Sequence, residues 1–130
     1  LAVVDRRLSD QEFADFIGAS DVVLLPYENS TGSGVLLAAW TLTKTVVASR
    51  LGYFEELLTE NAAAGSLFKA GDPDDLVEAL RQEVNRPPSQ RIAAARAAAA
   101  RYPWDKCVIP VRDALEQICS ANSKSLEAVR

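Results

Sequence analysis

The polar loop Pro26–Gly34 is the stretch of this sequence best suited to chemistry. Its Gly32-Ser33-Gly34 core lets a ligand approach the backbone closely, because glycine has no Cβ atom. A helix that begins near Ser33 would direct free N–H groups and the positive end of its dipole at this loop. The loop therefore predicts an anion site suited to a diphosphate. A simple helix cap also explains the same serine and glycines, so both interpretations stay open.

The loop differs from the common nucleotide-binding loops. No Gly-Lys-Ser/Thr follows it, so it is not a Walker loop. It also lacks the Gly-x-Gly-x-x-Gly pattern of a dinucleotide-binding turn. A Cys/His zinc site is excluded because the chain has no histidine. Cys107 and Cys119 fall in one expected helix, about 18 Å apart, so they cannot be bonded to each other in that helix. A reducing compartment fits this cysteine usage.

Composition and charge indicate one soluble globular domain. Of the 130 residues, 48% are hydrophobic and 25% are charged. The net charge is -4, and Arg91, Arg96 and Arg101 are spread along an alanine-rich segment, so we expect no nucleic-acid partner. No apolar run approaches the roughly 20 residues that a membrane span needs.

Four short segments predict strands that position the loop, the first three of them buried. They are Leu1–Val4, Val22–Leu25, Val46–Ser49 and Ser66–Lys69. Runs that are apolar throughout are typical of parallel strands covered on both faces. Ligands bind such sheets beyond the carboxyl ends of the strands, which places Pro26–Gly34 and Ser49–Gly52 where function is expected.

Helices are predicted between and after these strands. Ser9 and Glu12 have the spacing of a capping box, and Asp72 with Pro73 is typical of a helix start. The expected helices are Asp10–Ala19, Val35–Leu42, Phe54–Leu58, one that opens at Asp72-Pro73, Ser89–Arg101 and Asp105–Ser120. The alternation predicts an α/β domain, with residues 1–121 as a partial domain and residues 122–130 as a frayed polar tail. Because the chain lacks methionine and opens on a strand-like run, we expect it to be a piece of a longer protein.

Several motifs in order resemble the donor-binding core of retaining GT-B glycosyltransferases of glycosyltransferase family 4. The matching residues are Asp21, Leu25-Pro26-Tyr27, Gly32-Ser33-Gly34, Thr45-Val46-Val47-Ala48-Ser49, Gly52 and Glu56. The segments 61–82 and 101–107 resemble later parts of the same pattern, so the resemblance covers nearly the whole chain. It implies a Rossmann-like parallel sheet with helices on both faces, as part of a GT-B C-terminal domain.

The resemblance also implies a function. These enzymes transfer a sugar from a nucleotide-sugar to an acceptor with retention of the anomeric configuration, in pathways such as polysaccharide biosynthesis. The donor-binding residues that it implies are Tyr27, Thr31, Gly32, Ser33, Gly34, Val35, Gly52 and Glu56. A UDP-, GDP- or ADP-sugar is the expected substrate, and neither a metal nor another cofactor is expected. The parent protein is expected in the cytoplasm, with the inner face of the membrane as an alternative.

Two acidic positions of the family hold no acid here. The family commonly carries two glutamates separated by seven residues, and these positions fall on Thr31 and Ala39. Glu28 lies three residues too early to replace the first of them. Glu56 can also be explained without a ligand, because acidic side chains at an exposed helix start interact favourably with the helix dipole. Catalytic residues therefore stay unassigned, and a non-catalytic α/β structural or interaction domain is the alternative. A third alternative is a different sugar-nucleotide enzyme of the same architecture, such as an epimerase. The sequence shows no histidine and no clear general acid/base pair for that chemistry.

The resemblance places Leu1–Val4 at the third strand of the second GT-B domain. It implies that the acceptor domain and two strands with their basic phosphate-binding residues are missing, so we expect the chain alone to be inactive. Either Leu1–Val4 moves over to pair with Val22–Leu25, or a bare apolar edge remains. A bare edge pairs readily with other chains, which predicts a homodimer through that edge as the alternative to a rearranged sheet.

Overall fold

The computed structural model describes the backbone of residues 3–127 and the side chains of residues 3–119. It divides into two compact units, one ending at Ala99 and the other beginning at Ala100. The first unit contains α1 (Asp10–Ala19), β1 (Val22–Leu25), α2 (Gly34–Thr41), β2 (Thr45–Ser49), α3 (Gly52–Glu60), the 3-10 turn η1 (Ala62–Ala64), β3 (Gly65–Phe68), α4 (Pro73–Asn85) and α5 (Pro88–Ala99). The second unit contains α6 (Trp104–Glu127).

The three strands form one parallel sheet in the order β1-β2-β3, as a right-handed α/β alternation predicts. In register, Val22 of β1 lies opposite Thr45 of β2, and Val46 of β2 lies opposite Gly65 of β3. Every residue of β2 is buried, as expected of a central strand that helices cover on both faces. The predicted Rossmann-like α/β class is therefore confirmed.

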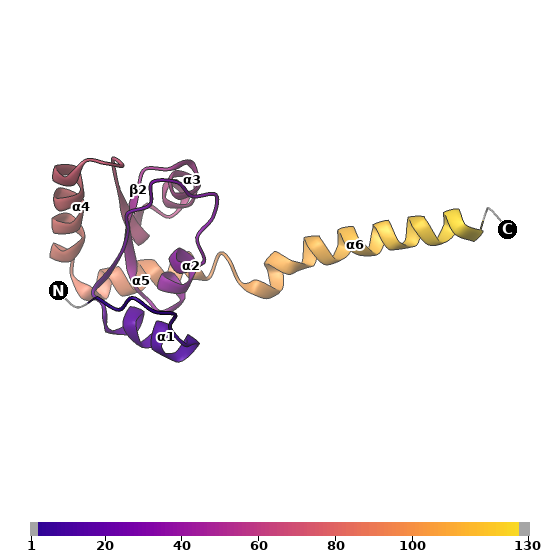
Figure 1. Cartoon of the computed structure of the whole chain (residues 1–130), viewed down its shortest axis with the longest axis horizontal. Coiled ribbons are helices and arrows are strands. Elements are labelled where there is room, and N and C mark those ends of the chain that lie inside the picture. The colour runs from indigo at the N-terminus through magenta and orange to yellow at the C-terminus, as the bar shows by residue number, and fades with distance from the viewer. Residues whose placement is uncertain (1–2, 128–130) are drawn as a thin grey trace. The chain divides into compact units, whose positions relative to one another are not determined.

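Alternate residues of β2 pack against different helices. Val47 packs with Phe68 of β3 and Ala79 of α4 on one face of the sheet. Val46 points to the other face, where a Cβ atom added at Gly65 would lie 2.7 Å from its Cγ2 atom and 3.0 Å from Leu58 Cδ2 of α3. Figure 1 shows α4 on one side of the strands and α2 and α3 on the other.

Helix starts follow the local capping signals. Ser9 and Glu12 form the predicted capping box, and α1 has the predicted bounds. Asp72 caps α4 by accepting a hydrogen bond from the Asp75 N–H group. Trp40 is fully buried in the core, and its Nε1 atom donates to the Ala64 carbonyl 3.0 Å away, which ties α2 to η1.

The predicted first strand is wrong for the residues that can be judged. Val3 and Val4 are irregular and their side chains are 79% and 44% exposed, while Leu1 and Ala2 lie outside the described residues. An apolar run becomes a strand only when a neighbouring strand takes up its backbone hydrogen bonds. In the part of the chain that is described, no strand pairs with the outer edge of β1, where Leu24 is 38% exposed.

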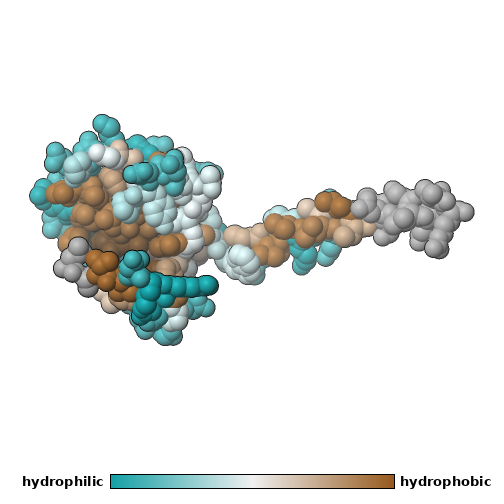
Figure 2. All heavy atoms as spheres, in the orientation of Figure 1, coloured by the Kyte–Doolittle hydropathy of each residue, from teal (hydrophilic) through white to brown (hydrophobic). Residues whose placement is uncertain are grey.

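The second unit is dominated by one amphipathic helix. Helix α6 extends over 24 residues with Pro110 inside it, and its backbone continues past residue 121 to Glu127. Residues 128–130 of the expected polar tail lie outside the described residues. Trp104, Val111, Leu115 and Ile118 are exposed, and Figure 2 shows the apolar surface along this helix. Within the described residues, no helix has the length and apolar character needed to cross a membrane.

Candidate functional site

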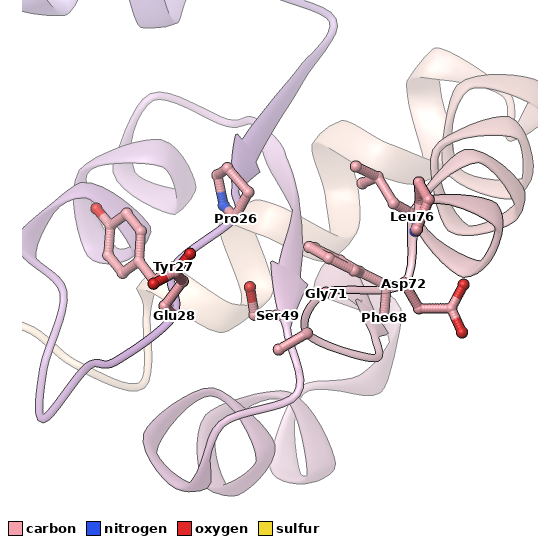
Figure 3. A pocket seen from close by; sticks show the side chains of 10 residues that line it. Pro26, Tyr27, Glu28, Ser49, Phe68, Gly71, Asp72 and Leu76 are labelled. Atoms are coloured by element: carbon pink, nitrogen blue, oxygen red, sulfur yellow. The ribbon is translucent and has the colours of Figure 1, made fainter.

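A cavity of about 310 Å³ opens at the carboxyl ends of all three strands (Figure 3). This is the edge where ligands bind in parallel α/β sheets, and the volume is at the lower end of the range for small-molecule sites. The lining residues come from the loops after β1, β2 and β3 and from the start of α4. They are Pro26, Tyr27, Glu28, Ser49, Phe68, Ala70, Gly71, Asp72, Pro73 and Leu76.

The cavity has an apolar floor and a few polar groups. Pro26, Phe68 and Leu76 supply apolar surface, and Phe68 is anchored in the core. Figure 3 shows the Ser49 side chain between the segment that carries Glu28 and the segment that carries Phe68. The Ser49 side chain is buried, and its hydroxyl donates to the Leu25 carbonyl over a long 3.4 Å.

The loop Pro26–Gly34 leads into α2 beside this edge. Ser33 is 7% exposed and its Oγ atom accepts a hydrogen bond of 3.3 Å from the Leu36 N–H group. The helix-cap interpretation therefore holds for the Ser33 side chain. The N–H groups of Gly34 and Val35 begin the first turn and have no acceptor within the helix, which is the condition that an anion site at this loop requires.

The glycines of the predicted donor site are not required by packing. A Cβ atom added at Gly32, Gly34 or Gly52 would meet no described atom within 4 Å. None of the three has a backbone conformation reserved for glycine. The space in front of the loop is open, and a ligand that approaches the backbone would make glycine necessary there.

The structure brings only part of the predicted donor site together. Thr31 to Val35 lie on the loop and the first turn of α2, while Gly52 and Glu56 lie near the start of α3 and are exposed. The Tyr27 ring contacts Phe54 of α3, with 5.6 Å between ring centroids, and so links the two groups. Of the predicted donor-site residues, Tyr27 alone lines the cavity.

Sequence reasoning missed the contribution of the third strand end. The sequence places Ser49 at a strand end, but it predicts only a strand at Phe68 and a helix start at Asp72, which line the cavity together with Gly71. The carboxyl-end rule, applied to β3 as well, would have found them. Glu28, which lies three residues too early for the family's acidic position, lines the cavity, and within the described part of the chain no hydrogen bond or ion pair engages its carboxylate.

Two arginines that precede or follow the loop, Arg6 and Arg50, form ion pairs with carboxylates. The Arg50 guanidinium lies 3.2 Å from Glu55, and Arg6 pairs with Glu12 at 2.5 Å. The Arg6 guanidinium, helped by Ser9, lowers the pKa of Glu12 to about 2. No Lys or Arg lines the cavity, and the described residues contain no group of three or more His, Cys, Asp or Glu side chains placed to hold a metal ion.

The fold and the site edge agree with the family relationship. The sequence pattern of the glycosyl transferases group 1 family matches residues 2–85, so the chain belongs to this family.

Curated relatives carry glycosyltransferase names. The chain is 31% identical over 99 residues, 75% of its length, to a phosphatidyl-myo-inositol mannosyltransferase of Propionibacterium freudenreichii subsp. shermanii. It is 29% identical over 116 residues, 86% of its length, to a sulfoquinovosyl transferase of Arabidopsis thaliana. It is 35% identical over 98 residues, 73% of its length, to a D-inositol 3-phosphate glycosyltransferase of Corynebacterium urealyticum. The matches span 26%, 23% and 23% of these proteins, so the chain corresponds to about a quarter of each.

Proposed function

We propose that this chain is the donor-binding part of a retaining glycosyltransferase with the GT-B arrangement, and that it binds a nucleotide-sugar. The observation that carries the proposal is the first turn of α2, where the Gly34 and Val35 amides face an open loop. The loop lies at the carboxyl edge of the sheet, and its glycines are not needed for packing.

The proposed chemistry is electrostatic. As the sugar leaves, negative charge develops on the nucleoside diphosphate, and preorganised amides at a helix start stabilise that charge without reorganisation. Ser33 holds the helix start in place through its hydrogen bond to Leu36. The cationic group that such a leaving group needs is proposed to come from outside the chain; within it, Arg50 pairs with Glu55 and Arg6 with Glu12. We therefore expect the chain alone to bind a donor weakly and to be inactive.

The rest of the proposed assembly lies outside the chain. An acceptor domain and two further strands would complete the site, in keeping with the quarter of its relatives that the chain spans. Two of the relatives' names specify different transferred sugars, mannosyl and sulfoquinovosyl, so the names select none for this chain. Transfer in the cytoplasm or at the inner membrane face, for polysaccharide synthesis, belongs to the same proposal. In the isolated chain the open edge of β1 would form a homodimer, which gel filtration tests.

A non-catalytic α/β domain is the second candidate, and the missing acidic pair favours it. Ala39 is fully buried in α2, and Thr31 carries no charge. Neither residue can therefore supply the carboxylate that the resemblance places there.

A ligand-observed NMR titration with UDP, GDP, ADP and UDP-sugars separates these candidates. Gly34→Trp fills the space in front of the α2 amides, so we expect it to abolish nucleotide binding. Gly18→Trp is the matched control, because Gly18 also has no described atom within 4 Å of its added Cβ but lies on α1. Equal binding by the two variants, or no binding by the unmodified chain, would contradict the proposal.

A further inference from the structure

A second, smaller cavity lies at the amino ends of the strands, opposite the edge that carries the donor loop. Its volume is about 70 Å³, and residues that precede β1 and β2 line it together with the start of α5. The lining residues are Asp21, Thr43, Lys44, Pro88, Arg91 and Ile92. Because Val22 pairs with Thr45 in register, the residues before these two lie at one edge of the sheet. We infer that this cavity binds a single phosphate group, at a site separate from the proposed donor site.

Arg91 is a buried cation whose charge is only partly compensated. Its side chain is 8% exposed, and its Nη1 atom donates to the Asp21 carbonyl 2.9 Å away. The Asp21 carboxylate lies 3.7 Å from Nη2 and is 83% exposed, so water screens its attraction for the guanidinium. The Arg91 Nε atom is buried and has no hydrogen-bond partner within the described residues. A buried charge without full compensation costs free energy, which an anion bound beside the guanidinium would recover.

Lys44 adds a second cation to the same cavity. Its side chain is partly buried, and within the described part of the chain its ammonium has neither a hydrogen bond nor an ion pair. The end of α2 fixes its backbone, because the Lys44 N–H group donates to the Ala39 carbonyl at 2.8 Å and the Thr43 N–H group donates to the Trp40 carbonyl at 2.9 Å. Thr43 has a φ of 62°, the left-handed conformation that closes a Schellman motif. The chain therefore turns sharply after α2, and Lys44 lies at the amino edge directly before β2.

The size and charge of the cavity select its ligand. A volume of about 70 Å³ exceeds the roughly 15 Å³ that one water molecule needs and is far below the roughly 300 Å³ of small-molecule sites. The lining side chains include two cations, Lys44 and Arg91, and one carboxylate, Asp21, which leaves an excess of one positive charge. Arginine binds phosphate oxygens through its planar fork of donors, and lysine binds them as a point charge. A single phosphate group, as the free ion or as the end of a phosphate ester, meets both conditions.

Heteronuclear NMR on the isotope-labelled chain tests this assignment with inorganic phosphate, compared with sodium chloride at equal ionic strength. We expect phosphate to shift the amide signals of Asp21 and Lys44 and the Nε–H signal of Arg91, and to do so saturably. Lys44→Gln should weaken this binding about tenfold, the usual effect of losing a charge-assisted hydrogen bond. Asp21→Asn should strengthen it, because the carboxylate that competes with phosphate is removed. Arg96→Gln is the matched control: it also removes one positive charge, but Arg96 is exposed on α5 and does not line the cavity.

The arms of the experiment separate this site from the proposed donor site. Gly34→Trp should leave the binding of inorganic phosphate at this cavity unchanged, because Gly34 lies at the opposite end of α2. Methyl phosphate that binds as tightly as inorganic phosphate assigns the site to a phosphate ester, whereas a preference for inorganic phosphate assigns it to the free ion. The site is overturned by the absence of a saturable shift at Lys44 and Arg91, by equal weakening in Lys44→Gln and Arg96→Gln, or by weaker binding in Asp21→Asn. Nucleotide binding that Gly34→Trp abolishes would still sustain the proposed function.

Discussion

Gly65 is the glycine of the sheet whose replacement should be most damaging. A Cβ atom at this position would lie 2.4 Å from the Val46 carbonyl oxygen, 2.7 Å from Val46 Cγ2 and 3.0 Å from Leu58 Cδ2. The nearest atom belongs to the backbone of the central strand, so it cannot rotate away. The backbone of Gly65 is extended (φ 168°), a conformation that alanine adopts freely, so the effect would be steric alone.

The expected cost of Gly65→Ala follows from two opposing terms. Forcing a methyl group into a packed core costs about 3 kcal/mol at the upper end of the usual range. Replacing glycine lowers the entropy of the unfolded chain, which returns about 0.7 kcal/mol. The net expectation is a loss of about 2 kcal/mol of unfolding free energy.

Urea unfolding followed by tryptophan fluorescence measures this loss. Trp40 is fully buried and hydrogen-bonded to the carbonyl of Ala64, the residue before Gly65, whereas Trp104 is 82% exposed. A Trp104→Phe background therefore leaves Trp40 as the reporter of the sheet unit. Gly18→Ala is the control of opposite sign: it has free space on α1 and should stabilise by about 0.7 kcal/mol. A Gly65→Ala chain as stable as the parent would refute the reasoning.

Two further predictions concern the helix starts. Ser33→Ala removes the acceptor for the Leu36 N–H group and should lower the unfolding free energy by about 1 kcal/mol in the same urea assay; an unchanged midpoint would argue against the cap. Because the pKa of Glu12 is lowered from 4.5 to about 2, its interactions with Arg6 and Ser9 stabilise the fold above pH 4.5 and lose that effect as the pH falls toward 2. Glu12→Gln should flatten this part of the stability profile, and an identical acid transition in both chains would contradict the assignment.

The capped helices could be read from the sequence because their signals are local. The capping box of Ser9 and Glu12 and the Asp72-Pro73 start each need only residues within one turn, and both are present. The predicted strands β1, β2 and β3 likewise lie in a parallel sheet with helices on both faces, and apart from Leu24 their residues are buried or half-buried. Strands rich in apolar residues are typical of parallel sheets that helices cover on both faces.

Leu1–Val4 shows where this reasoning ends. The run has the same apolar character as β1, yet Val3 and Val4 lie outside the sheet and leave the outer edge of β1 unpaired by any strand of the described residues. Pairing depends on neighbours far away in the chain, and periodicity carries no information about which neighbours are present.

The motifs alone identified the family, the class of fold and the edge of the sheet where function was expected. The tertiary structure decided which side chains share that edge: it joined Glu28, Ser49 and Phe68 in one cavity and left Gly52 and Glu56 outside its lining. The physical reason is that parallel strands bring the ends of distant segments together at one edge, so a site there is assembled across the register of β1, β2 and β3.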